Sequence, residues 1–143
     1  MIHLLDANML IALRDADHIH AEAAIQFFET DAVRDGWATC PLTQNAFLQI
    51  LGNPNYPHGP GSPEEARRIL KGLLAAPGHR FWPDEISLSD ETLAPSLPPP
   101  SQLTDCYLLA LAVRKNGNLV TFDRGIQASS VKGGKKALKI LRA

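Results

Sequence analysis

Short apolar runs alternate along the chain with longer stretches whose apolar residues recur every three or four positions. The short runs are rich in strand-forming residues and bounded by turn residues, which is typical of buried strands. They cover residues 2–5, 37–40, 80–82, 119–122 and 137–141. Helical periodicity and helix-start signals predict helices over residues 8–13, 18–33, 43–50, 62–76, 89–94 and 103–115. Strands that alternate with helices favour an α/β fold with a mostly parallel sheet.

Local signals define several helix ends. Ser62 is expected to cap the helix that follows it, with Pro63 at the first helical position and Glu65 completing a capping box. Thr43 is expected at or near the N-cap of its own helix. The pair Asn116-Gly117 provides the left-handed residue at which helices commonly stop.

Three aspartates fall where a parallel sheet would bring them together. Asp6 ends the first apolar run, Asp123 follows the run 119–122, and Asp105 lies in the first turn of a helix. Ligands of open α/β sheets bind at the carboxyl ends of the strands. Carboxylates that converge there repel one another unless a cation lies between them. Oxygen ligands without nearby Cys or His suit Mg²⁺ or Mn²⁺.

Four segments of the chain, in order, resemble the motifs of PIN-domain ribonucleases, and within these the VapC toxins of bacterial toxin–antitoxin pairs. The segments are MIHLLDAN (1–8), PLTQNAF (41–47), TDCYLLALA (104–112) and TFDRG (121–125). Each motif is weak by itself, but four in order across the chain make a specific match. The sequence departs from the family at one position, because the family usually has Glu where this chain has Gln44.

The resemblance implies a PIN-like three-layer sandwich, with a mostly parallel central sheet flanked by helices, formed by residues 1–143 as a single domain. It also implies a metal-dependent endoribonuclease that hydrolyses phosphodiester bonds of single-stranded or looped RNA. Asp6, Asp105 and Asp123 would bind Mg²⁺ or Mn²⁺, and Gln44 would join them in the catalytic set. The expected partners are the RNA substrate, a second copy of the chain and a VapB-like antitoxin.

Gln44 leaves alternatives open. An amide is nearly isosteric with Glu but neutral, so it weakens a second metal more than the first. The chain is then a working natural variant, a binding module or a silenced enzyme, and we favour the first. The alternative function is a PIN-fold module that binds RNA or protein without cutting. A receiver-like phospho-aspartate domain is disfavoured, because Asp6 has no acidic neighbours.

Each acid also has a purely structural interpretation. Asp6 suits a helix cap, Asp105 suits a first helical turn, and Asp123 suits a turn or an ion pair with Arg124. The shared metal site is favoured because all three acids are expected at one sheet edge. Asn8 could orient Asp6 or cap the helix.

The other polar residues near the acids are interpreted more simply. Thr121 is expected to serve as a β-branched strand residue more than to contact the site. His18 and His20 are expected at the surface, and none of the five histidines shows ligand spacing near the acids.

Composition places the chain among soluble cytoplasmic proteins. Its 143 residues, 45% of them hydrophobic, suit one domain with a real core. No signal peptide and no membrane-spanning run is present. Cys40 and Cys106 are expected to pack as small apolar groups, as in a reducing cytosol.

Net charge does not favour nucleic-acid binding through bulk attraction. The formal charge is −1 and the pI is near 6.5, although a local basic patch would suffice. A first cluster, Arg67, Arg68 and Lys71, is interpreted as a solvated helix face. The second cluster is formed by Lys132, Lys135, Lys136, Lys139 and Arg142. For this second cluster, phosphate contact and a solvated surface are equally supported.

Overall fold

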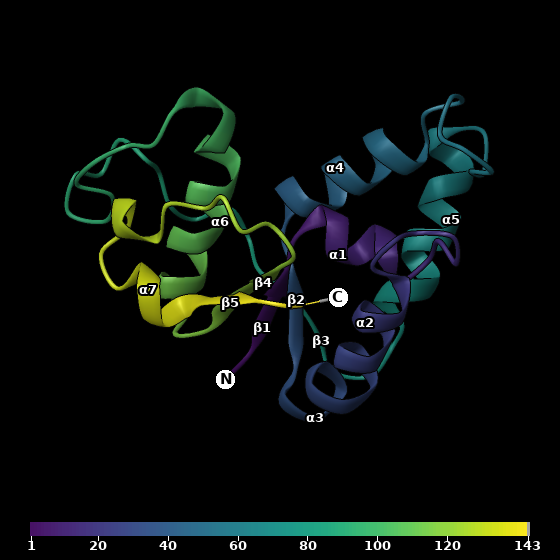
Figure 1. Cartoon of the computed structure of the whole chain (residues 1–143), viewed down its shortest axis with the longest axis horizontal. Coiled ribbons are helices and arrows are strands. Elements are labelled where there is room, and N and C mark those ends of the chain that lie inside the picture. The colour runs from purple at the N-terminus through teal and green to yellow at the C-terminus, as the bar shows by residue number, and fades with distance from the viewer. Residues whose placement is uncertain (143) are drawn as a thin grey trace.

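The central element is a sheet of five parallel strands in the order β3-β2-β1-β4-β5. A computed structural model describes residues 1–142 (Figure 1). The strands are β1 (His3–Leu5), β2 (Trp37–Thr39), β3 (His79–Phe81), β4 (Asn118–Thr121) and β5 (Leu138–Ile140). Every pairing of neighbours is parallel, so β1 lies between β2 and β4. The expectation of a mostly parallel α/β sheet is confirmed.

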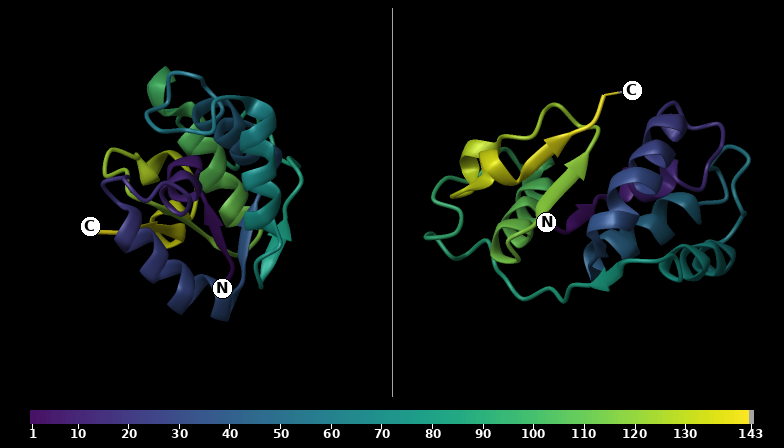
Figure 2. Two further views of the ribbon diagram at one scale, coloured as in Figure 1. Left: turned by 90° about the vertical axis from the view of Figure 1, so that its right-hand side faces the viewer. Right: turned by 90° about the horizontal axis from the view of Figure 1, so that it is seen from below.

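Helices cover both faces of the sheet and give the three layers. One layer is formed by α1 (Ala7–Ala12), α2 (Ala21–Phe27), α3 (Val33–Asp35), α4 (Pro41–Leu51) and α5 (Pro63–Leu74). The other is formed by α6 (Leu103–Arg114) and α7 (Gly134–Ala137). Figure 1 shows α6 and α7 on one side of the sheet and α1, α2, α4 and α5 on the other, and the side view in Figure 2 agrees.

Two apolar cores follow from the alternation of side chains along the strands. Leu5 and Val120 point to the layer of α1, α2, α4 and α5, where Trp37 is fully buried. Their neighbours Leu4 and Leu119 point to the opposite face and pack with α6. Since successive residues of a strand face opposite ways, a sheet buried on both faces needs such continuous apolar runs.

Two predicted helices are corrected by the structure. The helix expected over 18–33 begins at Ala21 and widens into a π-helical turn at Phe28–Ala32 before α3. The brief helix expected from Ser89 does not form. There, Asp90 accepts hydrogen bonds from the backbone N–H and the hydroxyl of Thr92, at 3.0 and 2.6 Å. Such local side-chain bonds compete with helix formation.

Predicted helix ends are mostly confirmed. Ser62 caps α5 by accepting a bond from the Glu65 N–H at 3.2 Å. Asn116 adopts the left-handed conformation with φ 56°, after α6. Thr43 is instead the third residue of α4, which begins at Pro41; its hydroxyl accepts the N–H of Cys40 at 3.0 Å.

Both cysteines are buried and free, as expected. Among residues 1–142, no helix is long and apolar enough to cross a membrane.

Candidate active site

Asp6 lies directly after β1, at the edge of the sheet where the strands end (the carboxyl edge). Its side chain caps α1, because Oδ1 accepts the Met9 N–H at 2.8 Å. The residue is only 5% exposed. The pKa of Asp6 is raised from 3.8 to about 6, first by burial and to a lesser degree by the charges of Asp105 and Asp123, while hydrogen bonds from Thr121 and Met9 partly offset the increase. The capping interpretation is therefore correct, and it coexists with a perturbed carboxyl group.

Thr121, the last residue of β4, joins two of the acids. Its hydroxyl donates to Oδ2 of Asp6 and accepts the backbone N–H of Asp123 at 3.0 Å. Thr121 is fully buried. The expectation that it serves mainly as a strand residue is wrong, since its hydroxyl orients Asp6 from the neighbouring strand. In the parallel register of β1 and β4, Leu5 is paired with Val120, so Thr121 is level with Asp6 on the neighbouring strand.

Asp105 approaches the same edge from the other side. It is the third residue of α6 and is half-buried. Burial raises its pKa, and the charge of Asp123 raises it further. Asp6 and Asp105 line one cavity of about 190 Å³, together with Asn8 and Thr43. The side chain of Asn8 is exposed there, and Asp6 takes its hydrogen bonds from Met9 and Thr121.

Asp123 is exposed, and its Oδ1 accepts the Gly125 N–H at 2.7 Å in a tight turn. Within residues 1–142, no three His, Cys, Asp or Glu side chains lie close enough to hold a metal ion as they stand. The donors nevertheless fit a hard cation in kind, because all are carboxylate oxygens and their mutual repulsion is uncompensated. A cation would complete this site, which is not a preformed cage.

Gln44 lies in the first turns of α4, and its side chain bonds away from the acids. Its amide nitrogen donates to the Thr39 hydroxyl at 2.9 Å, and that hydroxyl is 2.7 Å from Nε2 of His79. Burial lowers the pKa of His79, which favours the neutral ring. Gln44 is not among the residues that line the cavity of Asp6 and Asp105. In this conformation it anchors α4 to β2 and β3.

Two histidines lie closer to the site than expected. The ring of His20 stacks on Phe122, with centroids 4.1 Å apart and planes at 8°. His18 is 5.7 Å from His20, measured between ring centroids. Both histidines are half-buried, and the ring of His20 is packed on Phe122 where a plain surface position was expected. Sequence spacing offers no signal for this stack, because it joins a loop to the end of a distant strand.

The second basic cluster is divided between the two edges of the sheet. Lys135 and Lys136 lie in α7, which precedes β5 and therefore lies at the amino edge, opposite the acids. Arg142 follows β5 and therefore lies at the carboxyl edge. The residues of this cluster thus cannot act together at the candidate site.

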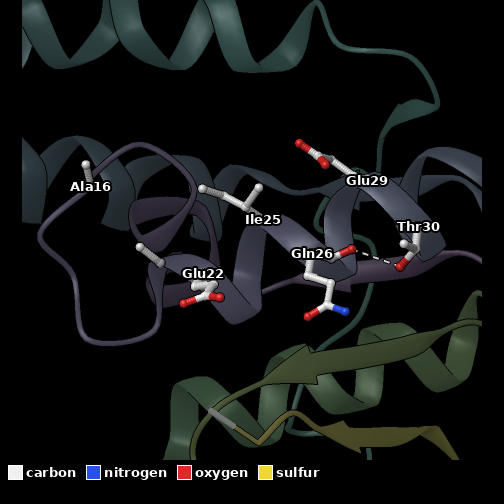
Figure 3. Close-up of a pocket in the computed structure, with 7 residues that line it drawn as sticks. Ala16, Glu22, Ile25, Gln26, Glu29 and Thr30 are labelled. Atoms are coloured by element: carbon white, nitrogen blue, oxygen red, sulfur yellow. Dashed lines mark hydrogen bonds between the residues drawn. The ribbon is translucent and has the colours of Figure 1, made fainter.

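A larger hollow of about 620 Å³ lies on the outer face of α2. Figure 3 shows Glu22 and Glu29 pointing in different directions on either side of Ile25 and Gln26. Its carboxylates are not gathered, and it is separate from the cavity of Asp6 and Asp105.

Comparison with known proteins agrees with this arrangement. The sequence matches the PIN domain family over residues 3–131. It is 40% identical over 135 residues to Ribonuclease VapC44 of Mycobacterium tuberculosis, covering 93% of this chain and 94% of the relative. It is 42% identical over 123 residues to Ribonuclease VapC38 of the same species, covering 86% of each. The chain belongs to the PIN domain family. Within that family it groups with the VapC ribonucleases.

Two solved structures share the fold. The crystal structure of VapBC2 from Rickettsia felis, bound to a DNA fragment from its promoter, gives a TM-score of 0.62 at 13% identity, covering 99% of this chain and 100% of the other. VapC20 of Mycobacterium tuberculosis, a Sarcin-Ricin loop cleaving toxin, gives 0.63 at 14% identity, covering 91% and 96%. At these identities the likeness concerns the fold alone.

Proposed function

We propose that this chain is a metal-dependent endoribonuclease, the toxin of a VapBC-like toxin–antitoxin pair, which hydrolyses RNA phosphodiester bonds. One observation carries the proposal. Asp6 is buried with its pKa raised to about 6, beside Asp105 and Asp123 at the carboxyl edge of a parallel sheet. A perturbed carboxylate cluster at this edge is typical of a functional site. The kinship to VapC ribonucleases supports the chemistry.

Asp6, Asp105 and Asp123 would hold the cation, Mg²⁺ or Mn²⁺. When bound, the cation supplies the Lewis acidity and positive charge that three carboxylates lack. The chain's own residues orient and hold it. Thr121 and the Met9 N–H fix both oxygens of Asp6, leaving further lone pairs on each oxygen free to coordinate. Gln44 would assist only if its side chain left Thr39.

The partners follow from the same kinship. We propose that residues 1–143 form one PIN domain, that two copies form a homodimer, and that a VapB-like antitoxin blocks the site. A toxin that cuts RNA would act in the cytoplasm. The support for the antitoxin is the likeness to VapC ribonucleases and the shared fold of VapBC2.

The kinship to VapC ribonucleases supports the endoribonuclease and not the alternative of a PIN-fold module that binds RNA or protein without cutting, and the bond between Gln44 and Thr39 bears only on how many cations the site holds. The family's usual Glu is replaced by an amide that is already engaged at 2.9 Å. The cluster then has three carboxylates, and a second cation would bind weakly.

The test is cleavage of a structured RNA by the full-length chain. Cleavage should require a divalent ion, stop with chelator and fall at least about 1,000-fold in Asp105→Asn, as for loss of a group essential to the transition state. Asp31→Asn is the matched control, since Asp31 is on the surface of the π-helical turn that leads to the amino edge. Binding of RNA without any metal-dependent cleavage would support the alternative module.

A further inference from the structure

We propose that His18, His20 and Arg142 form a subsite for a nucleotide of single-stranded RNA beside the acids, with the base on the histidine rings and its phosphate on Arg142. This inference rests on the proposed function, because it names the path of that enzyme's substrate. The three residues are called the flanking subsite below.

Aromatic rings form a ladder that starts next to the candidate active site. Phe122 immediately precedes Asp123, and the ring of His20 lies parallel to it at 4.1 Å. His18 continues the ladder at 5.7 Å from His20, with its plane tilted by 44°. Ile19, between them, is 84% exposed, so this loop faces solvent. A base that leaves the scissile phosphate toward this side would meet the outer ring of the ladder, His18, which His20 supports from behind.

The Nδ1 atoms of the two histidines are both turned toward the protein. The His20 backbone N–H donates to Nδ1 of His18 at 3.0 Å, so Nδ1 is the acceptor and a neutral His18 carries its proton on Nε2. Nδ1 of His20 is buried with no hydrogen-bond partner in residues 1–142, and is the single buried side-chain atom of this kind there. A polar contact with His20 is therefore left to its Nε2.

Arg142 lies at the same edge as the ladder. The Leu141 N–H donates to the Thr121 carbonyl at 2.8 Å, which continues the pairing of β5 with β4 to the level of the acids. Arg142 follows directly, is exposed, and makes no ion pair within the described chain. In Figures 1 and 2 the carboxyl end of β5 lies beside α2. The Lys139 ammonium, 5.8 Å from the Phe27 ring centroid, joins these two elements.

This combination suits single-stranded RNA. Stacking of a base on an aromatic side chain contributes about 1–3 kcal/mol, and only unpaired bases present their faces in this way. An arginine binds phosphate by two parallel hydrogen bonds. The chain has a net charge of −1, so phosphate attraction has to be local. Lys135 and Lys136 are at the opposite edge of the sheet.

The test measures binding of a fluorescent single-stranded oligoribonucleotide to the full-length protein by anisotropy, with chelator present to prevent cleavage. His18→Ala, which removes the outer ring of the ladder, should weaken binding about 5- to 100-fold, as expected for a lost stack, and His18→Phe should retain it. Arg142→Gln should weaken binding and lower the salt slope by about one. Lys136→Gln removes the same charge at the amino edge and should change neither.

An abasic nucleotide identifies the stacked position. At that position, loss of the base should weaken binding to the wild-type protein but not to His18→Ala, because the two changes remove one contact. Wild-type affinity in both His18→Ala and Arg142→Gln would overturn the subsite, as would a failure of the wild-type protein to bind the oligonucleotide.

The outcomes separate the subsite from the proposed function. Metal-dependent cleavage with unchanged affinity in both variants would leave the nuclease standing without the flanking subsite. Loss of affinity in both variants, with no cleavage by the wild-type protein, would leave an RNA-binding subsite without the nuclease.

Discussion

The buried polar residues at the two ends of β1 differ in whether an oppositely charged partner compensates them. His3 begins the strand at the amino edge and Asp6 follows it at the carboxyl edge. Both are 5% exposed. At the amino edge the polar groups are matched with opposite partners, whereas at the carboxyl edge none of the three aspartates makes an ion pair within residues 1–142.

At the amino edge, both ring nitrogens of His3 are engaged. Nδ1 is 2.7 Å from Oδ1 of Asn118, and Nε2 is 2.9 Å from Oδ2 of Asp35. Arg34 donates to both oxygens of Asp35, at 2.8 and 3.0 Å. Arg34 first and His3 second hold the pKa of Asp35 well below its usual range. This network ties β1 to β4 and to α3, and it stabilises the fold.

At the carboxyl edge, burial and two like charges oppose ionisation of Asp6. The contrast sets a stabilising ion-pair network at one end of a three-residue strand against the candidate active site at the other. A fold retains uncompensated carboxylates most readily where a ligand relieves them. The contributions of Asp6 and Asp35 to the free energy of unfolding should therefore depend on pH in opposite ways, which makes the contrast measurable.

The largest effect is expected for Asp6→Asn without metal. The pKa of Asp6 is raised to about 6, so the stabilising contribution of its protonated form is present below pH 4 and is lost as the pH rises through 6. Neutralisation should therefore raise the free energy of unfolding by up to about 3 kcal/mol at pH 8, at about 1.4 kcal/mol per pKa unit. Urea unfolding at pH 4 and pH 8 measures it. A variant less stable than wild type at pH 8 would show that the cap outweighs the repulsion.

At the amino edge, a substitution is expected to lower the free energy of unfolding and not to raise it. His3→Leu should lower the free energy of unfolding by about 2 kcal/mol at pH 7, because buried partners lose their hydrogen bonds. His58→Asn is the control, since His58 is exposed and Asn tolerates its φ of 55°. Equal stability of His3→Leu and wild type would remove the contrast between the edges.

The pH dependence of the stability of Asp35→Asn tests the same comparison between the two edges. The pKa of Asp35 is depressed, so its contribution is present above the ordinary value of 3.8 and is lost as the pH falls through the depressed one. The variant should melt lower than wild type at pH 7, and the gap should close toward pH 2. A gap that widened on acidification would contradict the assigned ion pair.

The smallest effect is expected for Gln44→Glu. If the new carboxylate leaves Thr39 for the acids, affinity for Mn²⁺ should rise about fivefold, and the gain should vanish when Asp105 is also replaced by Asn. Gln49→Glu, on the exposed face of the same helix, is the control. Calorimetric titration measures both. No change in affinity would mean that residue 44 only anchors α4, despite its place in the family motif.

The sequence allowed the strands, the sheet edge and the positions of Asp6, Asp105 and Asp123 to be predicted, because strand ends and helix starts have local signatures. Orientation across elements had no such signature. The Thr121 hydroxyl, the bond of Gln44 to Thr39 and the stack of His20 on Phe122 each depend on which way a side chain turns toward a distant segment.

The failed helix from Ser89 illustrates a different limit. Its residues suit both the start of a helix and a local turn. The hydrogen bonds between Asp90 and Thr92 stabilise the turn. The π-helical turn at Phe28–Ala32 lies within a stretch whose apolar residues keep helical spacing on both sides, so the spacing does not reveal it. Periodicity alone does not distinguish these outcomes.

The most direct test of the central claim is a Mn²⁺ titration followed by thermal unfolding, at pH 7.5, of the wild-type chain and its Asp6→Asn, Asp105→Asn and Asp123→Asn variants. A ligand that binds only the folded state at 100 times its Kd stabilises it by about 2.7 kcal/mol. We predict a rising melting temperature for wild type and little or no response in each variant. A wild-type response in all three variants would place the cation elsewhere and contradict the account.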